Sequence, residues 1–289
     1  MKSTSPHNCS DKNESCLICG GVVRYYFSKV YDLKLHSLSM SRLEVDYHRC
    51  EICGFVVSRT HQRMSAEEWS DLNSKFHHHL ERNSESKTFN QPPYAEQALA
   101  LQMLNAASLI DPCSILDYAA GYGTLARVLK KYFKLDIDLY DPFVINDEGG
   151  LHYVSVSDQT KYKLVINSAM FEHVLDRRSL DRVNELVADD GVLMLHTVIC
   201  ERVPPDPNWF YLEPVVHTAF HTNASMKILM EQWGYASSVY SPQAKCWFLF
   251  KEDNSSVGRL EIEVAKINAE LQTKWFHYKQ GFMDYWKGF

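Results

Sequence analysis

The order of apolar and polar positions divides this chain into a short β-rich beginning and a long alternating region. From residue 94 onward, short apolar runs typical of buried strands alternate with segments whose apolar residues recur at helical spacing. The predicted strands cover residues 114–119, 136–141, 151–156, 163–168, 191–198, 236–241 and 246–252. The predicted helices cover residues 94–110, 124–133, 177–187 and 224–234. This alternation predicts an α/β fold with a doubly wound, mostly parallel sheet.

The beginning of the chain has a different pattern. Short β segments are predicted at residues 22–27, 41–50 and 54–59, and a polar stretch with one helix follows. A tail rich in aromatic residues, expected to be helical, closes the chain. The expected organisation is therefore a small module (1–62), a linker (63–93), the α/β domain (94–252) and the tail (253–289).

Four of the eight cysteines form two CxxC pairs, Cys16 with Cys19 and Cys50 with Cys53, and a glycine follows each pair. A CxxC turn directs two thiolates at one point, so two such turns complete a tetrahedral Zn²⁺ site. All four ligands are sulfur, which leaves no position for a substrate, and the ion is expected to fold the module. Unrelated buried thiols or a redox pair are the alternatives, and Cys9 is a candidate stray ligand.

Composition narrows the class of protein. An apolar content of 45% is enough for a full core, and no run approaches the length of a membrane span. The polar start differs from a secretory signal, so a cytoplasmic protein with reduced thiols is expected. A formal net charge of −6 argues against a broad nucleic-acid surface.

A glycine-rich turn lies between the first predicted strand and helix of the α/β domain, in the segment ILDYAAGYGTL (115–125). Small residues there let a ligand approach the backbone, although NAD enzymes use a related device. Asp117, just before the turn, suits a positively charged ligand better than a pyrophosphate. Asp141 ends the next strand, twenty residues after Gly121, where an acid accepts hydrogen bonds from ribose hydroxyls.

These motifs resemble those of the class I S-adenosylmethionine-dependent methyltransferases. DYAAGYG (117–123) is similar to the first motif, DxGxGxG, with an alanine for the first glycine, and residues 141–143 are similar to the second motif. The Glu-His pair in residues 164–176 is similar to the end of the fourth strand. The resemblance covers about residues 95–250 and implies a seven-stranded sheet whose last strand is antiparallel. It implies S-adenosylmethionine as the cofactor, bound by Asp117, Ala119, Gly121, Gly123, Asp141, Pro142, Phe143, Asp158, Asn167 and Ser168.

A second resemblance extends over the whole chain. A two-CxxC module before such a domain looks like the sugar-modifying methyltransferases of deoxysugar and surface-polysaccharide pathways. This resemblance implies methyl transfer to a hydroxyl or carbon of a sugar, with a small molecule or glycan as substrate. The C-methylating members carry a tyrosine two residues before Glu-His, where this chain has Met170, so O- or N-methylation stays open. An RNA-base methyltransferase, an inactive binding scaffold and an oligomeric assembly also stay open.

Three side chains are the candidates for work on the methyl acceptor. Methyl transfer depends on positioning, and a hydroxyl acceptor also benefits from a base such as histidine. His173 follows the fourth strand of the domain and is the expected base, with Glu172 orienting it and structural hydrogen bonds as the alternative role. His217 is expected to face the substrate, beside an aromatic wall at 209–211. Ala169 stands where metal-binding relatives have a further acid, so no catalytic metal is expected.

Overall fold

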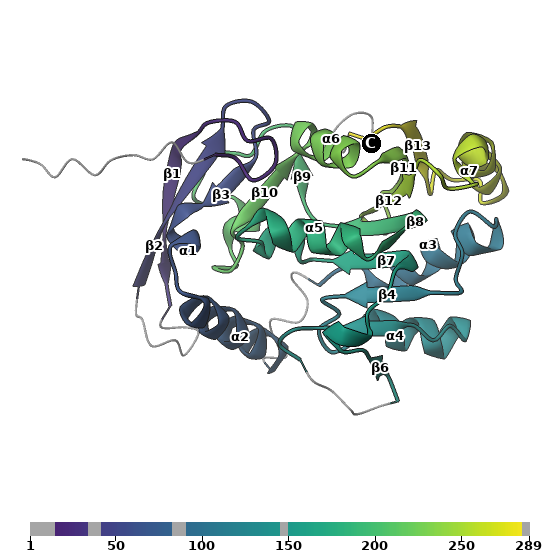
Figure 1. Cartoon of the computed structure of the whole chain (residues 1–289), viewed down its shortest axis with the longest axis horizontal. Helices are drawn as coiled ribbons and strands as arrows, with labels where there is room; N and C mark the ends of the chain where they lie inside the picture. The colour runs from purple at the N-terminus through teal and green to yellow at the C-terminus, as the bar shows by residue number, and fades with distance from the viewer. Residues whose placement is uncertain (1–14, 34–41, 83–90, 145–149, 285–289) are drawn as a thin grey trace, which may run out of the picture.

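The computed structural model describes residues 15–33, 42–82, 91–144 and 150–284, which form two sheets side by side (Figure 1). The larger sheet has the strand order β13-β11-β12-β8-β7-β4-β5-β6. Its strands are β4 (Ile115–Tyr118), β5 (Asp138–Tyr140), β6 (His152–Tyr153), β7 (Tyr162–Ser168), β8 (Val187–His196), β11 (Tyr235–Ser241), β12 (Cys246–Lys251) and β13 (His277–Gln280). All seven predicted strands are present.

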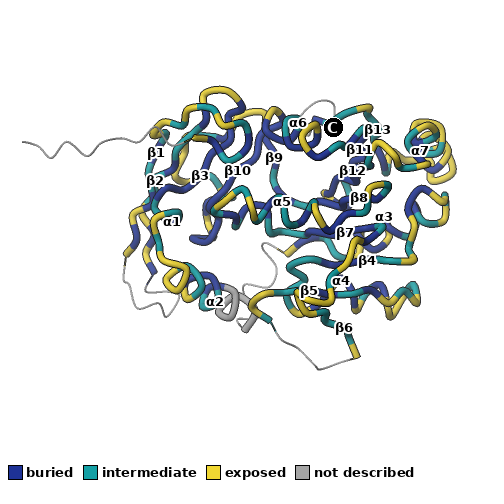
Figure 2. Tube along the Cα trace, in the orientation of Figure 1, coloured by how far each residue is buried: buried dark blue, intermediate teal, exposed yellow. Residues whose placement is uncertain are grey.

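The sheet is mixed because its last strands reverse direction. The strands from β6 to β8 pair in parallel, whereas β12 is antiparallel to both β8 and β11. Alternate side chains of β7 point to opposite faces of the sheet. Val165 packs in the core on one face and Leu164 in the core on the other. Both faces are therefore covered, and the buried tube in the centre of Figure 2 follows these strands.

Helices cover the two faces of the sheet in separate groups. The helices α5 (Arg177–Glu185) and α6 (Asn223–Gln232) bury apolar residues on one face. On the other face lie α3 (Tyr94–Ala106), α4 (Thr124–Val128) and α7 (Leu260–Glu270). The chain after α4 widens into a π-helical turn, η2 (Leu129–Phe133), within the predicted helix.

The tail departs from the sequence-based prediction. We expected a helical tail, and α7 confirms its first half, but residues 277–280 form β13. This strand pairs antiparallel with the outer edge of β11, through residues such as Tyr278 opposite Val239. The sheet thus has eight strands instead of seven, because the exposed edge of β11 offers backbone groups that a further strand can satisfy.

The smaller sheet joins the cysteine-containing module to the α/β domain. Its order is β1-β2-β3-β10-β9, where β1 (Val23–Asp32), β2 (Arg42–Cys50) and β3 (Val56–Ser58) come from the module. The other two strands, β9 (Ile199–Cys200) and β10 (Ala219–Thr222), come from the loop that follows β8. Since β3 pairs antiparallel with β10, the sheet crosses the boundary that the sequence suggested between module and domain.

The module also shares its core with the rest of the chain. Tyr47 and Phe27 pack with Leu212 and Phe220, which belong to the segment before α6. The linker helix α2 (Ala66–Arg82), which follows the short helix α1 (Arg59–Gln62), adds Leu72 and Phe76 to this core and lies at its lower end in Figure 1. A segment of this size has little apolar surface to bury alone, so sharing a core stabilises it. No helix within the described ranges is long and apolar enough to cross a membrane.

Candidate functional site

The glycine-rich turn lies between β4 and α4, as the sequence predicted. Ala119, Gly121 and Gly123 have φ angles of 64°, 54° and 72°, in the left-handed region. A Cβ atom at position 123 would lie 2.6 Å from the Leu151 side chain, so only glycine fits there. Ala119 adopts the same left-handed backbone at a cost of about 1 kcal/mol. The turn therefore keeps the glycine geometry although its first glycine is replaced.

Asp141 faces this turn from the end of the neighbouring strand, β5. One carboxylate oxygen accepts a hydrogen bond from the Gly121 backbone N–H at 2.8 Å. The other accepts from the N–H groups of Phe143 at 2.8 Å and Val144 at 3.0 Å. Because β4 and β5 pair in parallel, their carboxyl ends meet, and the structure brings together the two motifs that the sequence separates by one strand and one helix.

Asp117 is buried at the end of β4. Burial, together with the nearby carboxylate of Asp141, raises the pKa of Asp117 from 3.8 to about 7. Desolvation disfavours the charged form of an acid, so this carboxyl group keeps its proton to a much higher pH than an exposed aspartic acid does. A positively charged ligand would favour the ionised form. The site is therefore suited to a cation, and unfavourable for a pyrophosphate.

The remaining predicted cofactor residues have different settings. Asn167, at the end of β7, donates a hydrogen bond to the Tyr118 backbone oxygen at 3.1 Å, and Ser168 donates to Gln97 at 3.3 Å. Phe143 follows Pro142 and is 46% exposed, so its ring is available to a flat ligand. Asp158 is exposed, lies in the 3-10 turn η3 (Val156–Asp158) after β6, and accepts a hydrogen bond from Ser155.

Glu172, His173 and His217 form a second group of side chains. Glu172 and His173 lie in the 3-10 turn η4 (Phe171–His173) after β7, whereas His217 precedes β10. Each offers one potential ligand atom, and these three atoms lie within 4.8 Å of one another. The two imidazole centroids are 5.0 Å apart. The structure thus brings together the three residues that the sequence analysis proposed for the acceptor side.

Glu172 is a buried carboxylate with fixed orientation. The Tyr211 hydroxyl donates to one of its oxygens at 2.8 Å and the Thr197 hydroxyl to the other at 3.0 Å. Burial raises the pKa of Glu172 to about 7, and these hydrogen bonds oppose the rise. The Thr218 N–H also donates to the Glu172 backbone oxygen at 2.7 Å, which ties the turn η4 to the segment carrying His217.

Both histidines are oriented by backbone carbonyl groups. His173 donates from Nδ1 to the Val216 oxygen at 3.0 Å, and His217 donates from Nδ1 to the Tyr211 oxygen at 2.7 Å. A carbonyl oxygen only accepts, so each neutral ring carries its lone pair on Nε2. His221, in contrast, is fully buried in β10, and burial lowers its pKa to about 4, so it belongs to the core.

Two residues of this group were not predicted from the sequence. Tyr211 was expected only as part of an aromatic wall, yet its hydroxyl binds Glu172 and its carbonyl binds His217. Thr197 had no pattern that could identify it, since a threonine at the end of a strand is common. The aromatic segment that contains Tyr211 was the one available signal.

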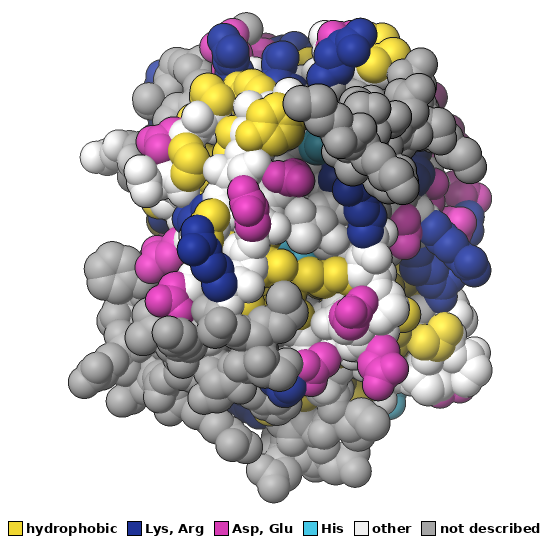
Figure 3. Space-filling model, turned by 90° about the vertical axis from the view of Figure 1, so that its left-hand side faces the viewer, with side chains coloured by type: hydrophobic (Ala, Val, Ile, Leu, Met, Phe, Trp, Pro, Cys, Tyr) yellow, Lys and Arg dark blue, Asp and Glu magenta, His cyan; other side chains and the backbone are white. Residues whose placement is uncertain are grey.

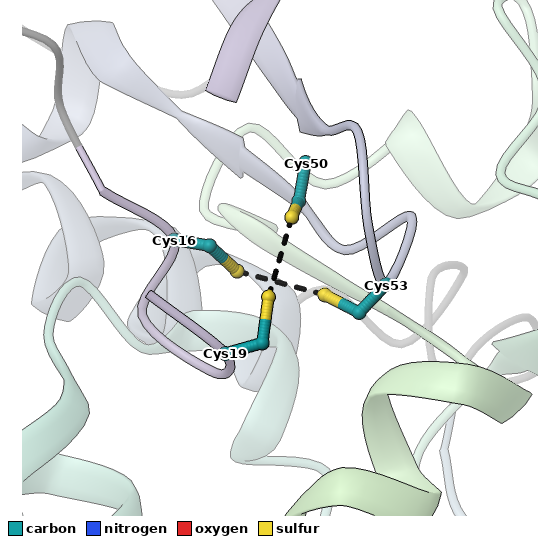
Figure 4. A group of neighbouring side chains, drawn as sticks. All are labelled: Cys16, Cys19, Cys50 and Cys53. Atoms are coloured by element: carbon teal, nitrogen blue, oxygen red, sulfur yellow. Dashed lines mark hydrogen bonds between the residues drawn. The ribbon is translucent and has the colours of Figure 1, made fainter. Parts of the chain in front are cut away.

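The four predicted zinc ligands converge at the base of the module (Figure 4). The sulfur atoms of Cys16 and Cys53 are 3.6 Å apart and those of Cys19 and Cys50 are 3.5 Å apart. A tetrahedral ion with Zn–S bonds of about 2.3 Å places its sulfurs about 3.8 Å apart, so the four thiols fit Zn²⁺. None of these four cysteines forms a disulfide. Cys9 lies outside the described residues.

Backbone groups support the cysteine cluster and attach it to the α/β domain. The N–H groups of Ile18 and Ile52 point at the Cys16 and Cys50 sulfurs, each at 3.4 Å, as glycine-terminated CxxC turns allow. The Cys53 carbonyl accepts a hydrogen bond from the Thr222 hydroxyl at 2.5 Å, and Thr222 is the N-cap of α6. The cluster is therefore built against a helix of the larger domain.

A second link runs from the module to the histidine group. The buried Tyr47 hydroxyl, in β2, donates to the His217 backbone oxygen at 3.1 Å. Tyr31, in β1, donates to the Leu212 oxygen at 2.8 Å and lies 3.0 Å from the Tyr47 hydroxyl. The module thus positions the loop that carries His217.

Comparison with known proteins identifies one family. A family model described as a methyltransferase domain matches residues 90–240. No curated protein sequence shows significant similarity to the chain.

Solved structures with a similar fold share little sequence. An O-methyltransferase family protein from Burkholderia thailandensis has 18% identity and a TM-score of 0.40, and the match covers 54% of this chain and 57% of that chain, little more than half its length. The 1,6-didemethyltoxoflavin-N1-methyltransferase of the same organism has 15% identity, a TM-score of 0.43 and coverages of 68% and 93%. The plantazolicin methyltransferase BamL has 13% identity, a TM-score of 0.44 and coverages of 75% and 93%.

Proposed function

Because the chain belongs to the methyltransferase-domain family, we propose that this methyltransferase moves the methyl group of S-adenosylmethionine to a hydroxyl or carbon of a sugar. One observation carries the proposal. The parallel strands β5, β4 and β7 end at the same edge of the sheet: Asp141 follows β5, Asp117 is the last residue but one of β4, and the turn with Glu172 and His173 follows β7. Ligands of open α/β sheets bind at this edge. A cofactor site and an acceptor site are thereby adjacent.

The cofactor would lie across the turn between β4 and β5. Asp117 would meet its cationic amino-acid end, Asp141 would accept hydrogen bonds from the ribose, and Phe143 would flank the adenine. The left-handed residues 119–123 allow close approach of the ligand to the backbone. We assign supporting roles to Asn167 and Ser168 at the end of β7, and a peripheral one to the exposed Asp158.

His173 would take the proton of a hydroxyl acceptor. Its Nδ1–H is held by the Val216 carbonyl, so the basic lone pair of the neutral ring is on Nε2. S-Adenosylmethionine, held by Asp117 and Asp141, would supply the methyl group: the new C–O bond would form as the C–S bond breaks, and S-adenosylhomocysteine would leave. Glu172 and His217 would orient this base and the acceptor.

Support for a sugar acceptor comes from the aromatic segment beside the histidine group. Phe210 is 61% exposed, next to Tyr211, whose hydroxyl binds Glu172. An exposed aromatic face gives a sugar ring a large contact area at small entropic cost. Release of S-adenosylhomocysteine with a panel of nucleotide-linked sugars tests this choice. Phe210→Ala is expected to raise the KM for the active sugar and to leave cofactor affinity unchanged.

Calorimetric titration tests the cofactor assignment directly. S-Adenosylmethionine is expected to bind and NAD is not, and Asp141→Ala is expected to weaken binding at least tenfold. Asp189→Ala is the matched control, because Asp189 is an exposed acid that pairs with Lys161 near the start of β8, at the opposite end of the strand from the site. Full-strength binding to Asp141→Ala, or binding of NAD instead, would refute the assignment. Binding without turnover on any acceptor would favour the scaffold alternative.

The RNA-base alternative has less support. On the module side of the molecule, Lys and Arg side chains are interspersed with Asp and Glu side chains (Figure 3). Arg24, one of the module's cations, pairs with Glu51 at 2.5 Å. A surface that neutralises many phosphates needs a continuous basic stripe. Salt-sensitive binding of RNA would revive this alternative.

We also propose that Cys16, Cys19, Cys50 and Cys53 hold a structural Zn²⁺ ion. The fit of their sulfur separations to a tetrahedral ion supports this assignment. With four sulfur ligands, the ion would stabilise the module and contribute no step of methyl transfer. Metal analysis of the purified protein is expected to find zinc at one ion per chain, and its absence from metal-replete protein would contradict the assignment.

A further inference from the structure

Glu172, His173 and His217 have a composition that methyl transfer alone does not require. Two imidazoles and one carboxylate, from segments more than forty residues apart, place their potential ligand atoms within 4.8 Å of one another. We propose that these three side chains bind a divalent first-row transition-metal ion, which is a second metal site distinct from the cysteine cluster. The proposal rests on the same site as the proposed function, and it replaces the expectation from Ala169 that no catalytic metal is present.

The hydrogen bonds of the two histidines are those of metal-binding imidazoles. A histidine that binds a metal through Nε2 usually donates Nδ1–H to a carbonyl or carboxylate, which fixes the ring and raises its basicity. His173 makes this bond to Val216 and His217 makes it to Tyr211, at 3.0 and 2.7 Å. Both rings therefore carry the tautomer that coordination needs.

The carboxylate of Glu172 fits the same role. Only 2% of Glu172 is exposed, and within the described residues no lysine or arginine forms an ion pair with it. Buried carboxylates are normally paired with a cation or bound to a metal. Tyr211 and Thr197 each donate one hydrogen bond to a different oxygen of Glu172, and each of these oxygens has a further lone pair. A metal ion would supply the missing positive charge.

The donor set selects the class of ion and leaves positions open. Imidazole nitrogen suits ions from Mn²⁺ to Zn²⁺, whereas Mg²⁺ and Ca²⁺ prefer oxygen ligands. Bonds of about 2.1 Å need donors about 3.0–3.4 Å apart, so donors that lie up to 4.8 Å apart would approach one another by up to about 1.4–1.8 Å as the ion binds. Three protein ligands leave at least one position for an acceptor oxygen. Coordination would lower the pKa of an acceptor hydroxyl, whose proton then passes to solvent before its oxygen attacks the methyl group. A metal-bound His173 would hold the acceptor and would no longer act as the base.

Calorimetric titration with Co²⁺ of protein that holds one zinc ion per chain, the number that the four cysteines take, tests the second site. One further ion per chain is expected in the wild type. His173→Gln, His217→Gln and Glu172→Gln each remove a ligand and are expected to weaken this binding at least tenfold. Tyr211→Phe keeps the aromatic ring but removes the hydroxyl that binds Glu172, and it is expected to weaken binding about tenfold. His152→Gln is the matched control, because His152 also lies beside a carboxylate, that of Asp138 at 2.8 Å, but has no second imidazole.

Two results would overturn the proposal: no second Co²⁺ in the wild type, or a second Co²⁺ that all three ligand variants retain. Circular dichroism of each variant separates loss of a ligand from loss of fold, and Tyr211→Phe keeps the test valid if a ligand variant unfolds. Methyl transfer is measured separately. Turnover by protein that binds no second ion would refute the metal site and support the proposed function. Binding of the second ion without turnover on any acceptor would support the metal site and contradict the proposed function.

Discussion

Replacement of Asp117 by asparagine is expected to stabilise the cofactor-free protein at neutral and alkaline pH while it weakens cofactor binding. Asp117 is 3% exposed, and burial with a contribution from Asp141 raises its pKa to about 7. Asparagine has almost the shape of the protonated acid and carries no charge at any pH. The substitution therefore removes only the cost of ionising this buried group.

The size and direction of the effect follow from proton binding. The pKa of Asp117 is 3.8 in the unfolded chain and about 7 in the folded one, a difference worth about 4 kcal/mol. Below pH 4 both states hold the proton, and the wild type and Asp117→Asn are expected to be equally stable. Between about pH 4 and pH 7 the unfolded chain loses its proton first, so the wild type loses stability as pH rises. Above pH 7 the variant is then more stable by up to about 4 kcal/mol.

Urea unfolding at a series of pH values from 4 to 8 measures this difference. Asp158→Asn is the matched control, because Asp158 is exposed and its loss is expected to change the free energy of unfolding little. Titration with S-adenosylmethionine is expected to show at least tenfold weaker binding to Asp117→Asn, since the ionised acid meets a cation. If the variant and the wild type keep the same difference in stability at every pH, burial does not hold the proton on Asp117 and the reasoning fails.

Three further substitutions test the turn and the module. Ala119→Gly removes a left-handed alanine and is expected to raise the free energy of unfolding in urea by about 1 kcal/mol; a loss of stability would contradict the strain. Tyr47→Phe removes the hydrogen bond to the His217 carbonyl, and it is expected to lower the free energy of unfolding by about 1 kcal/mol and to lower kcat/KM. Unchanged kinetics would show that the module does not position the site through this bond. Cys53→Ser is expected to lose zinc and to expose the amides of β3 and β10 to hydrogen exchange, whereas retained protection would show that the pairing needs no metal.

Local patterns determined much of this protein. Each strand from β4 to β12 in the larger sheet was predictable because alternation of apolar runs with helical spacing is a property of neighbouring residues. The glycine turn and Asp141 were predictable as a pair because parallel strands one helix apart end at the same edge. The CxxC pairs specified their own turns, and with them the four converging sulfurs.

Only the tertiary structure decided the contacts that join distant segments. The pairing of β3 with β10, the added strand β13, and the hydrogen bonds of Tyr211 depend on backbone edges and carbonyl groups that carry no sequence signal. Tyr47 and His217 lie 170 residues apart. A tyrosine in a strand can pack in any core, so the sequence does not indicate which carbonyl group its hydroxyl binds. Sequence listed Glu172, His173 and His217 as separate candidates. Folding alone made them one site, because burial of the shared core holds the loop of β10 against the turn after β7.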